Sequence, residues 1–252
     1  MLRAALDALS SVLFPAPCRI CQAPLIAASS IPICLECLAS FERLSGPACR
    51  CCGRPFISIV AAQAQEPLCH ACRRGVYAFE LARSHAVYND PMMKAITLMK
   101  YEQVTRLGHW FAAQLAERVT ENAEAFRADV VLHPLRQRER GYNQAELIAR
   151  PLAKRLGLPL RTYLLVRTKP RPARHRLTRH ERWQTVRGAF ATRSGTQVDK
   201  LRVLLVDDVF TTGATLDSCS RTLQQAGAAG VMGLTVARVV PNWTPAREIG
   251  NQ

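Results

Sequence analysis

The sequence predicts an α/β protein in which a parallel sheet flanked by helices follows a small cysteine-rich module. Nine of the ten cysteines lie in the first third of the chain, whereas strand-length apolar runs alternate with helical patterns beyond it. The apolar run at residues 203–206 leads into two acids, a loop of small residues and an amphipathic segment at residues 216–226. This strand–loop–helix order is typical of a parallel sheet whose strand ends form a ligand site.

Four segments are expected in chain order. They are an amphipathic helix at residues 1–15, a double zinc-ribbon module at residues 16–76, an α/β domain at residues 77–241 and a loose tail at residues 242–252.

Composition and charge favour a globular protein with polyanionic ligands. The 252 residues suffice for one α/β domain and a smaller module, and 48% hydrophobic residues exclude a disordered chain. The formal charge of +15 favours nucleic acid or phosphorylated ligands, with a basic surface that has no single partner as the alternative. No run has the length of a membrane span, and residues 1–14 lack a signal-peptide pattern, so we expect a cytoplasmic protein.

The early cysteines form four C-x-x-C pairs. These are Cys18 and Cys21, Cys34 and Cys37, Cys49 and Cys52, and Cys69 and Cys72. A two-residue gap lets both thiolates of a pair bind one tetrahedral ion, and the longer gaps can form the hairpin of a zinc ribbon. We expect two structural Zn²⁺ ions, in the simplest pairing one on the first two pairs and one on the last two. An interleaved cross-brace remains open, and disulfides are disfavoured in a reducing compartment.

Three further residues near these pairs or outside them need an interpretation. Cys51 could replace Cys52 as a ligand, although the two-residue spacing favours Cys52. His70 lies inside the last pair and is expected to be exposed, and Cys219 is expected to be a small buried residue. Shells of four thiolates leave no open coordination position, so the module is expected to be structural or to bind a partner.

Strands and helices alternate through the second domain. The expected elements are a strand at residues 81–88, a helix beginning at residues 89–91, a helix at residues 107–119, a strand at residues 130–132, a helix at residues 143–157 and a strand at residues 160–166.

Two arginine-rich segments follow strands. Arg136, Arg138 and Arg140 come directly after the strand at 130–132, where they could hold a pyrophosphate, or they form a solvated basic turn. The segment at residues 167–187 supplies the nucleic-acid candidates. These are Arg174, Arg176, Arg179, Arg182 and Trp183. Arginines with an aromatic ring can bind a single strand, although a mobile loop folding over a phosphorylated ligand explains the same charges.

The loop after residue 206 predicts a phosphate site. It contains Asp207, Asp208, Thr211, Thr212, Gly213, Ala214 and Thr215. A helix N-terminus attracts phosphate, threonine hydroxyls add donors, and a glycine lets the backbone approach closely. The two acids could accept hydrogen bonds from sugar hydroxyls or lie near a divalent cation. Helix capping alone would explain only one or two of these residues.

The stretch from residue 203 to residue 216 resembles the phosphoribosyl-pyrophosphate loop of type I phosphoribosyltransferases. The resemblance implies that Asp207 and Asp208 hold the ribose hydroxyls and that residues 211–215 cradle the 5′-phosphate. It also implies Mg²⁺ together with phosphoribosyl pyrophosphate.

Taken over nearly the whole chain, the motifs resemble the ComF family. The further motifs are Leu13-Phe14-Pro15, Lys100-Tyr101, His133-Pro134-Leu135 and Gly188-Ala189-Phe190. This resemblance implies a type I phosphoribosyltransferase fold preceded by a zinc-binding module, and a role in DNA uptake on single strands with partners from the uptake machinery. The chain departs from the family near residue 175 and at Thr185, where the family commonly has glutamine and asparagine, which weakens inferences from that loop.

Three functions follow as hypotheses. The first is a cytoplasmic factor that handles single-stranded DNA in natural transformation and binds phosphoribosyl pyrophosphate or a nucleotide. The second is an active phosphoribosyltransferase, in which a nitrogenous base displaces pyrophosphate with Mg²⁺. The third is a nucleotide-sensing regulator. No base-binding segment is recognisable after the last strand, so we assign no catalytic residue and leave enzymatic activity open.

Overall fold

The computed structural model describes residues 17–25, 30–56, 67–135, 143–170, 178–193 and 198–241, without the side chains of Arg179, His180 and Arg182. The expected helix at residues 1–15 lies outside the described residues, and so does the expected tail at residues 242–252.

A five-stranded parallel sheet forms the centre of the molecule, with strand order β1-β7-β6-β2-β3. Its strands are β1 (Leu81–Val87), β2 (Val130–Leu132), β3 (Leu160–Arg161), β6 (Arg202–Phe210) and β7 (Gly230–Arg238). A separate antiparallel pair consists of β4 (Leu165–Arg167) and β5 (Phe190–Thr192). The predicted fold class is therefore confirmed.

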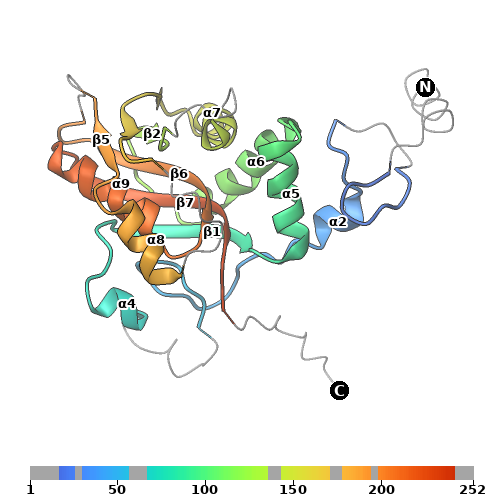
Figure 1. The fold of residues 1–252 in the computed structure, drawn as a ribbon, viewed down its shortest axis with the longest axis horizontal. Coiled ribbons are helices and arrows are strands. Elements are labelled where there is room, and N and C mark those ends of the chain that lie inside the picture. Colours follow the sequence, from blue (N-terminus) through green and yellow to red (C-terminus); the bar gives the residue numbers. More distant parts are fainter. Residues whose placement is uncertain are drawn as a thin grey trace.

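Helices cover both faces of the sheet (Figure 1). They are α5 (Asp90–Tyr101), α6 (Arg106–Thr120), α7 (Gln144–Leu156), α8 (Arg179–Val186) and α9 (Ala214–Gln225). Side chains of Leu204 and Val206 pack with α5, α6 and α7, whereas those of Val203 and Leu205 pack with α9. This alternation buries β6 on both faces, as the continuous apolar run predicts.

Local signals place the helix ends. The Asn89 side chain accepts a hydrogen bond from the Met92 N–H (3.4 Å) at the start of α5. Asn143 caps α7, and Gly157 ends that helix in the left-handed region, with φ 67°. Asn suits the start of a helix because its side-chain oxygen accepts a hydrogen bond from an N–H of the first turn. Gly suits the end because it has no Cβ that would clash at positive φ.

Two expected features differ from the structure. The single strand expected at residues 160–166 is divided into β3 and β4, because Tyr163 between them has φ 69°, which interrupts an extended chain. Part of the basic segment, expected as a loop, forms α8. Thr178 and Glu181 form a capping box at its start, a signal visible in the sequence.

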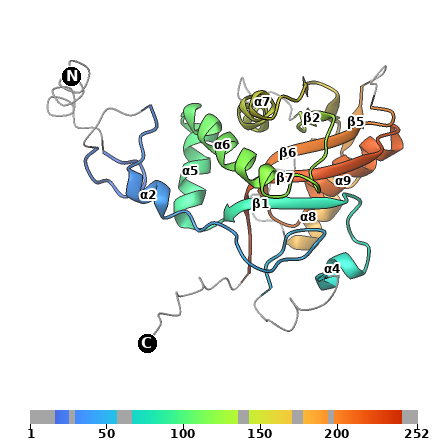
Figure 2. The same cartoon turned by 180° about the vertical axis from the view of Figure 1, so that it is seen from behind.

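Two short helices belong to the cysteine-rich module, namely α2 (Leu35–Ala39) and α4 (His70–Arg73). In Figures 1 and 2, α2 lies beside α5, whereas α4 lies well away from α2 on the side of the sheet near α8. Among the residues the structure describes, none of the helices is both long and apolar enough to cross a membrane.

Candidate functional site

The cysteines gather into two groups of four in chain order. The first group contains Cys18, Cys21, Cys34 and Cys37, and the second contains Cys49, Cys52, Cys69 and Cys72. Within each group the sulfur atoms all lie within 4.8 Å of one another, which corresponds to the simplest pairing and not to a cross-brace. Cys51 belongs to neither group, and its Sγ lies 3.8 Å from the Phe79 carbonyl oxygen.

The sulfur environment of both groups fits Zn²⁺. The Cys34 N–H donates to Cys18 Sγ (3.3 Å), and the Cys69 N–H donates to Cys49 Sγ (3.3 Å). Hydrogen bonding to Cys49 raises the pKa of Cys52 to about 12, so these thiols cannot all ionise without a cation. A zinc ion would stabilise all four thiolates, and in such closed shells it supplies folding energy and not catalysis. The protein therefore has two structural zinc sites.

Two acids lie near the carboxyl end of the central strand. Asp207 and Asp208 are 2% and 3% exposed. The strand β6 continues past them to Phe210 because β7 pairs with it along its full length. Lys100 from α5 lies with its Nζ 2.6 Å from Asp208 Oδ2, so a buried ion pair compensates one of the two charges.

The loop between β6 and α9 has a conformation that requires glycine. Gly213 has φ 82°, and a Cβ there would lie 2.6 Å from the rings of both Phe210 and Tyr77. Thr212 Oγ1 accepts a hydrogen bond from the Ala214 N–H (3.3 Å). Residues 209–213 therefore connect the two acids to the N-terminus of α9, which has unpaired N–H groups able to bind an anion.

The chain leaving the second cysteine group holds this loop. The Tyr77 hydroxyl donates to the Thr212 carbonyl oxygen (3.0 Å), and the Ala78 N–H donates to Asp217 Oδ1 (2.8 Å) on α9. Tyr77 stacks on Phe79 with ring centroids 4.8 Å apart. Residues that follow the second zinc site thus fix the position of the loop.

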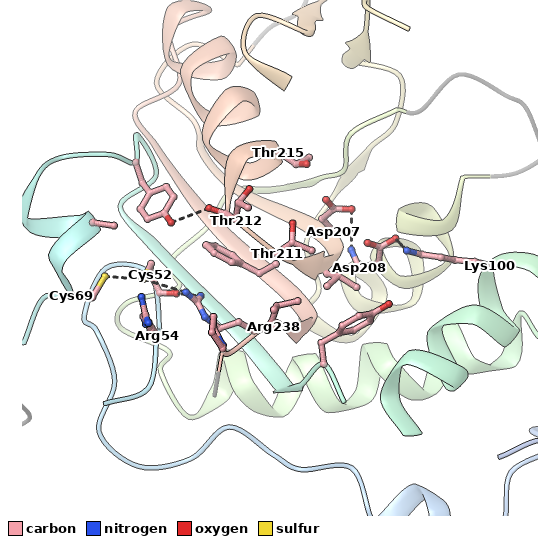
Figure 3. Close-up of a pocket in the computed structure, with 17 residues that line it drawn as sticks. Cys52, Arg54, Cys69, Lys100, Asp207, Asp208, Thr211, Thr212, Thr215 and Arg238 are labelled. Carbon is pink, nitrogen blue, oxygen red and sulfur yellow. Dashed lines mark hydrogen bonds and ion pairs between the residues drawn. The ribbon is translucent and has the colours of Figure 1, made fainter. Parts of the chain in front are cut away.

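A cavity of about 590 Å³ connects the loop to the second zinc site (Figure 3). The loop side contributes both acids and three threonines, namely Thr211, Thr212 and Thr215. The opposite side is lined by Cys52, Arg54, Cys69 and Ala71. The size falls within the range of small-molecule sites, which measure about 300–1,000 Å³.

Arg238 joins the two sides of this cavity. Its Nη1 donates to the Cys52 carbonyl oxygen (2.6 Å), and its Nη2 lies 3.6 Å from Cys52 Sγ. Its guanidinium carbon also lies 4.1 Å from the centroid of the Phe210 ring, directly before the threonine loop.

Arg54, Tyr77, Lys100 and Arg238 were not predicted as site residues. Two of them carried a signal. Arg238 lies at the carboxyl end of the last strand, where ligand sites form in parallel sheets, and Lys100 belongs to the Lys100-Tyr101 motif.

The other predicted site residues are described only in part. Arg136, Arg138, Arg140, Arg174 and Arg176 lie outside the described residues, as do the side chains of Arg179 and Arg182. Trp183 is half-buried, and its ring centroid lies 5.9 Å from that of Tyr77. His133, near the predicted pyrophosphate loop, is buried, which lowers its pKa, and its Nδ1 contacts the Asn143 side chain (3.1 Å). His70 is exposed and Cys219 is buried, as the sequence predicts.

Comparison with known proteins identifies relatives over most of the chain. The double zinc ribbon domain family matches residues 9–73. Competence protein ComFC of Bacillus subtilis is 26% identical over 82% of this chain and 84% of that protein. DNA utilization protein YhgH of Salmonella typhimurium is 28% identical over 86% of this chain and 94% of that protein.

The likeness to solved structures is weaker. Purine phosphoribosyltransferase from Pyrococcus horikoshii Ot3 is 18% identical, with a TM-score of 0.35, over 57% of this chain and 95% of that chain. The fold assignment rests on the strand order and the sequence relatives, not on this likeness. With two cysteine groups before a parallel sheet, and relatives of this kind along its length, the chain is similar to proteins of the ComF family over most of its length.

Proposed function

We propose that the pocket beside Asp207 and Asp208 binds phosphoribosyl pyrophosphate or a nucleotide, and that the protein handles single-stranded DNA in the cytoplasm during natural transformation. The observation that carries the first part is the pair of buried acids at the end of β6, which a short loop connects to the glycine-capped N-terminus of α9. Hydroxyl groups of a ribose suit carboxylates, and a 5′-phosphate suits the N–H groups and threonines of the loop. Carboxylate oxygens also suit Mg²⁺, which would accompany the diphosphate.

The names of the relatives support the nucleic-acid part. One relative is called a competence protein and another a DNA utilization protein. The charge of the second ribbon agrees with such a partner: its described residues between 45 and 79 include four arginines, Arg50, Arg54, Arg73 and Arg74, and no acidic side chain. All four arginines are exposed. A surface of this charge attracts the phosphates of a strand.

The ligand pocket is tested best with Asp207→Asn. Asp208 is held in a buried ion pair with Lys100, so removing its charge would destabilise the fold as well. Calorimetric titration with phosphoribosyl pyrophosphate and Mg²⁺ should show binding to the parent protein and at least a tenfold loss in the Asp207→Asn variant. The matched control is Asp90→Asn, which neutralises an exposed acid at the start of α5. Equal affinity in all three proteins would contradict the proposed pocket.

DNA binding is tested in parallel with a short single strand at two salt concentrations. We expect affinity to fall steeply with salt, because bound arginines release counterions from the phosphates. Binding that is absent at low salt would remove the nucleic-acid part and leave the phosphoribosyl part standing.

A transferase reaction is the second candidate, favoured by the extension of the cavity beyond the two acids towards the second ribbon. That space would admit a second reactant next to the ribose. Release of pyrophosphate with one member of a panel of nitrogenous bases would establish turnover, and binding without release would favour a binding or sensing role.

A further inference from the structure

Two arginines, Arg54 and Arg238, lie at the end of the pocket formed by the second zinc ribbon, beside the zinc-binding sulfurs and without an acid from the lining. Asp207 and Asp208 are the only acids among the described residues that line the cavity, and both belong to β6. Figure 3 shows Arg54 and the guanidinium of Arg238 beside Cys52, whereas Lys100 and Asp208 lie together at the other end.

Arg238 is buried without a carboxylate partner. It is 5% exposed, and among the described residues it forms no ion pair with an acid. Its contacts are the carbonyl and sulfur of Cys52 and the face of Phe210, and its Nε has no hydrogen-bond partner. Arginine has five N–H donors, and a buried donor left unpaired costs free energy, so Arg238 retains capacity for a further acceptor.

Arg54 occupies the turn of the second zinc site. Its carbonyl oxygen accepts a hydrogen bond from the Cys49 N–H (2.8 Å), so the backbone at Arg54 is fixed by a zinc ligand. Its side chain is exposed and lines the cavity. The second zinc site therefore positions both cations, Arg54 through the turn and Arg238 through Cys52.

We propose that Arg54 and Arg238 form a second phosphate subsite at the ribbon end of the pocket. It binds a phosphate that the ligand carries in addition to the 5′-phosphate at the threonine loop. Arginine suits this role because its planar donors match phosphate oxygens in pairs. The phosphate comes either from the diphosphate of phosphoribosyl pyrophosphate or from the next phosphodiester of a strand. This inference rests on the proposed phosphoribosyl pocket.

The test compares ligands that differ by the additional phosphate. One pair is ribose 5-phosphate and phosphoribosyl pyrophosphate, each with Mg²⁺, and the other is thymidine 5′-monophosphate and the 5′-phosphorylated thymidine dinucleotide. The parent protein should prefer the more highly phosphorylated member of one pair. Arg54→Ala should reduce that preference about tenfold and leave the affinity for the simpler member unchanged. The pair that responds identifies the source of the phosphate.

Arg19→Ala is the matched control, because Arg19 is an arginine of the first ribbon, and neither it nor its ion-pair partner Glu102 lines the pocket. Zinc content should remain two ions per chain in both variants, since neither side chain is a zinc ligand. The subsite would be overturned if the preference survives Arg54→Ala, or if the parent protein shows no preference at all. In either case, binding of the simpler ligands would still support the pocket. Failure of all four ligands to bind would overturn the pocket and the subsite together.

Discussion

The first and second zinc ribbons have the same turn geometry, yet among the described residues only those of the second ribbon line the pocket beside Asp207 and Asp208. The Cys18 N–H donates to the Ala23 carbonyl oxygen (2.7 Å), and the Cys49 N–H makes the equivalent bond to Arg54 (2.8 Å). Each turn then contains one residue in the left-handed region, Gln22 with φ 67° and Gly53 with φ 69°.

The surroundings of the two turns differ. A Cβ at Gly53 would lie 2.7 Å from the Ala82 carbonyl oxygen of β1, so this turn packs tightly against the sheet. The first ribbon packs instead against the helices, with the Phe41 ring edge-on to Trp110 of α6 (centroids 5.5 Å apart). Exposed ion pairs of Arg19 with Glu102 and of Arg43 with Glu121 add to this contact. Exposed pairs contribute only about 0–1 kcal/mol each. The comparison teaches that the cysteine spacing specifies a metal site, whereas the residues around it decide whether that site serves the pocket.

The largest expected effect on ligand affinity comes from removing one zinc ligand, and it should differ between the two ribbons. Cys52→Ser should lose one zinc ion and reduce affinity for phosphoribosyl pyrophosphate at least tenfold, because Cys52 holds Arg238 at the pocket. Cys21→Ser should also lose one zinc ion but keep ligand affinity within about twofold, since none of the first ribbon's described residues lines the cavity. Zinc binding contributes on the order of 10 kcal/mol to folding of such modules, so each ribbon should unfold locally. Zinc content and calorimetric titration measure both effects, and equal loss of affinity would break the comparison.

A smaller effect tests the clamp between the second ribbon and the phosphate loop. Gly213→Ala should destabilise the protein by about 3 kcal/mol, because it combines left-handed strain with collisions against Tyr77 and Phe210. Gly157→Ala is the control: it has φ 67° but no atom within 4 Å of its Cβ, so it should cost about 1 kcal/mol. Urea unfolding gives both values. Similar costs for the two variants would show that the ring contacts add nothing.

The stability of the protein should depend on pH through the buried side chain of His85, whose backbone lies next to the first ribbon. The His85 carbonyl oxygen accepts from the Leu44 N–H (2.9 Å), next to the first ribbon. Burial lowers the pKa of His85 from its usual value of 6.5 to about 4. The charges of Arg118 and Arg43 act in the same direction, and that of Glu121 opposes them.

Below pH 6.5 the unfolded chain binds the proton of His85 more readily than the folded chain. The contribution of neutral His85 to the free energy of unfolding is therefore complete above pH 6.5 and is lost as the pH falls towards 4. The loss should be on the order of 2–3 kcal/mol. His85→Gln should flatten this part of the urea-unfolding profile. Burial also lowers the pKa of His133, so its contribution with the same sign remains in the variant. An unchanged profile in His85→Gln would exclude His85 as the cause.

Most of the strands and helices could be predicted from the sequence, because short stretches of neighbouring residues determine them. The strand at residues 130–132 and the caps Asn89, Asn143 and Gly157 follow from apolar runs and from backbone requirements of single residues. The division of the strand at residues 160–166 could not be predicted, because no glycine marks the left-handed residue Tyr163. The helix α8 could have been found, because Thr178 and Glu181 have the spacing of a capping box.

The candidate site was predictable on one side only. The acids and threonines of the loop are consecutive in the chain, so their common chemistry is visible as a motif. The opposite side contains Arg54 and Tyr77, each separated from the loop by more than a hundred residues. Neither residue belongs to a sequence motif that marks it as part of the site, because each reaches the site only through contacts formed on folding.

The sequence by itself determined two tetrads of cysteines and one loop of acids, threonines and glycine before a helix, since metal ligation and helix capping depend on spacings of a few residues. Only the tertiary structure decided that the second tetrad faces the loop. The contact that joins them runs from Arg238 to Cys52, 186 residues apart, and it exists because β7 ends beside β6 and against the second ribbon. Such a contact depends on how the sheet is assembled, which no local pattern records.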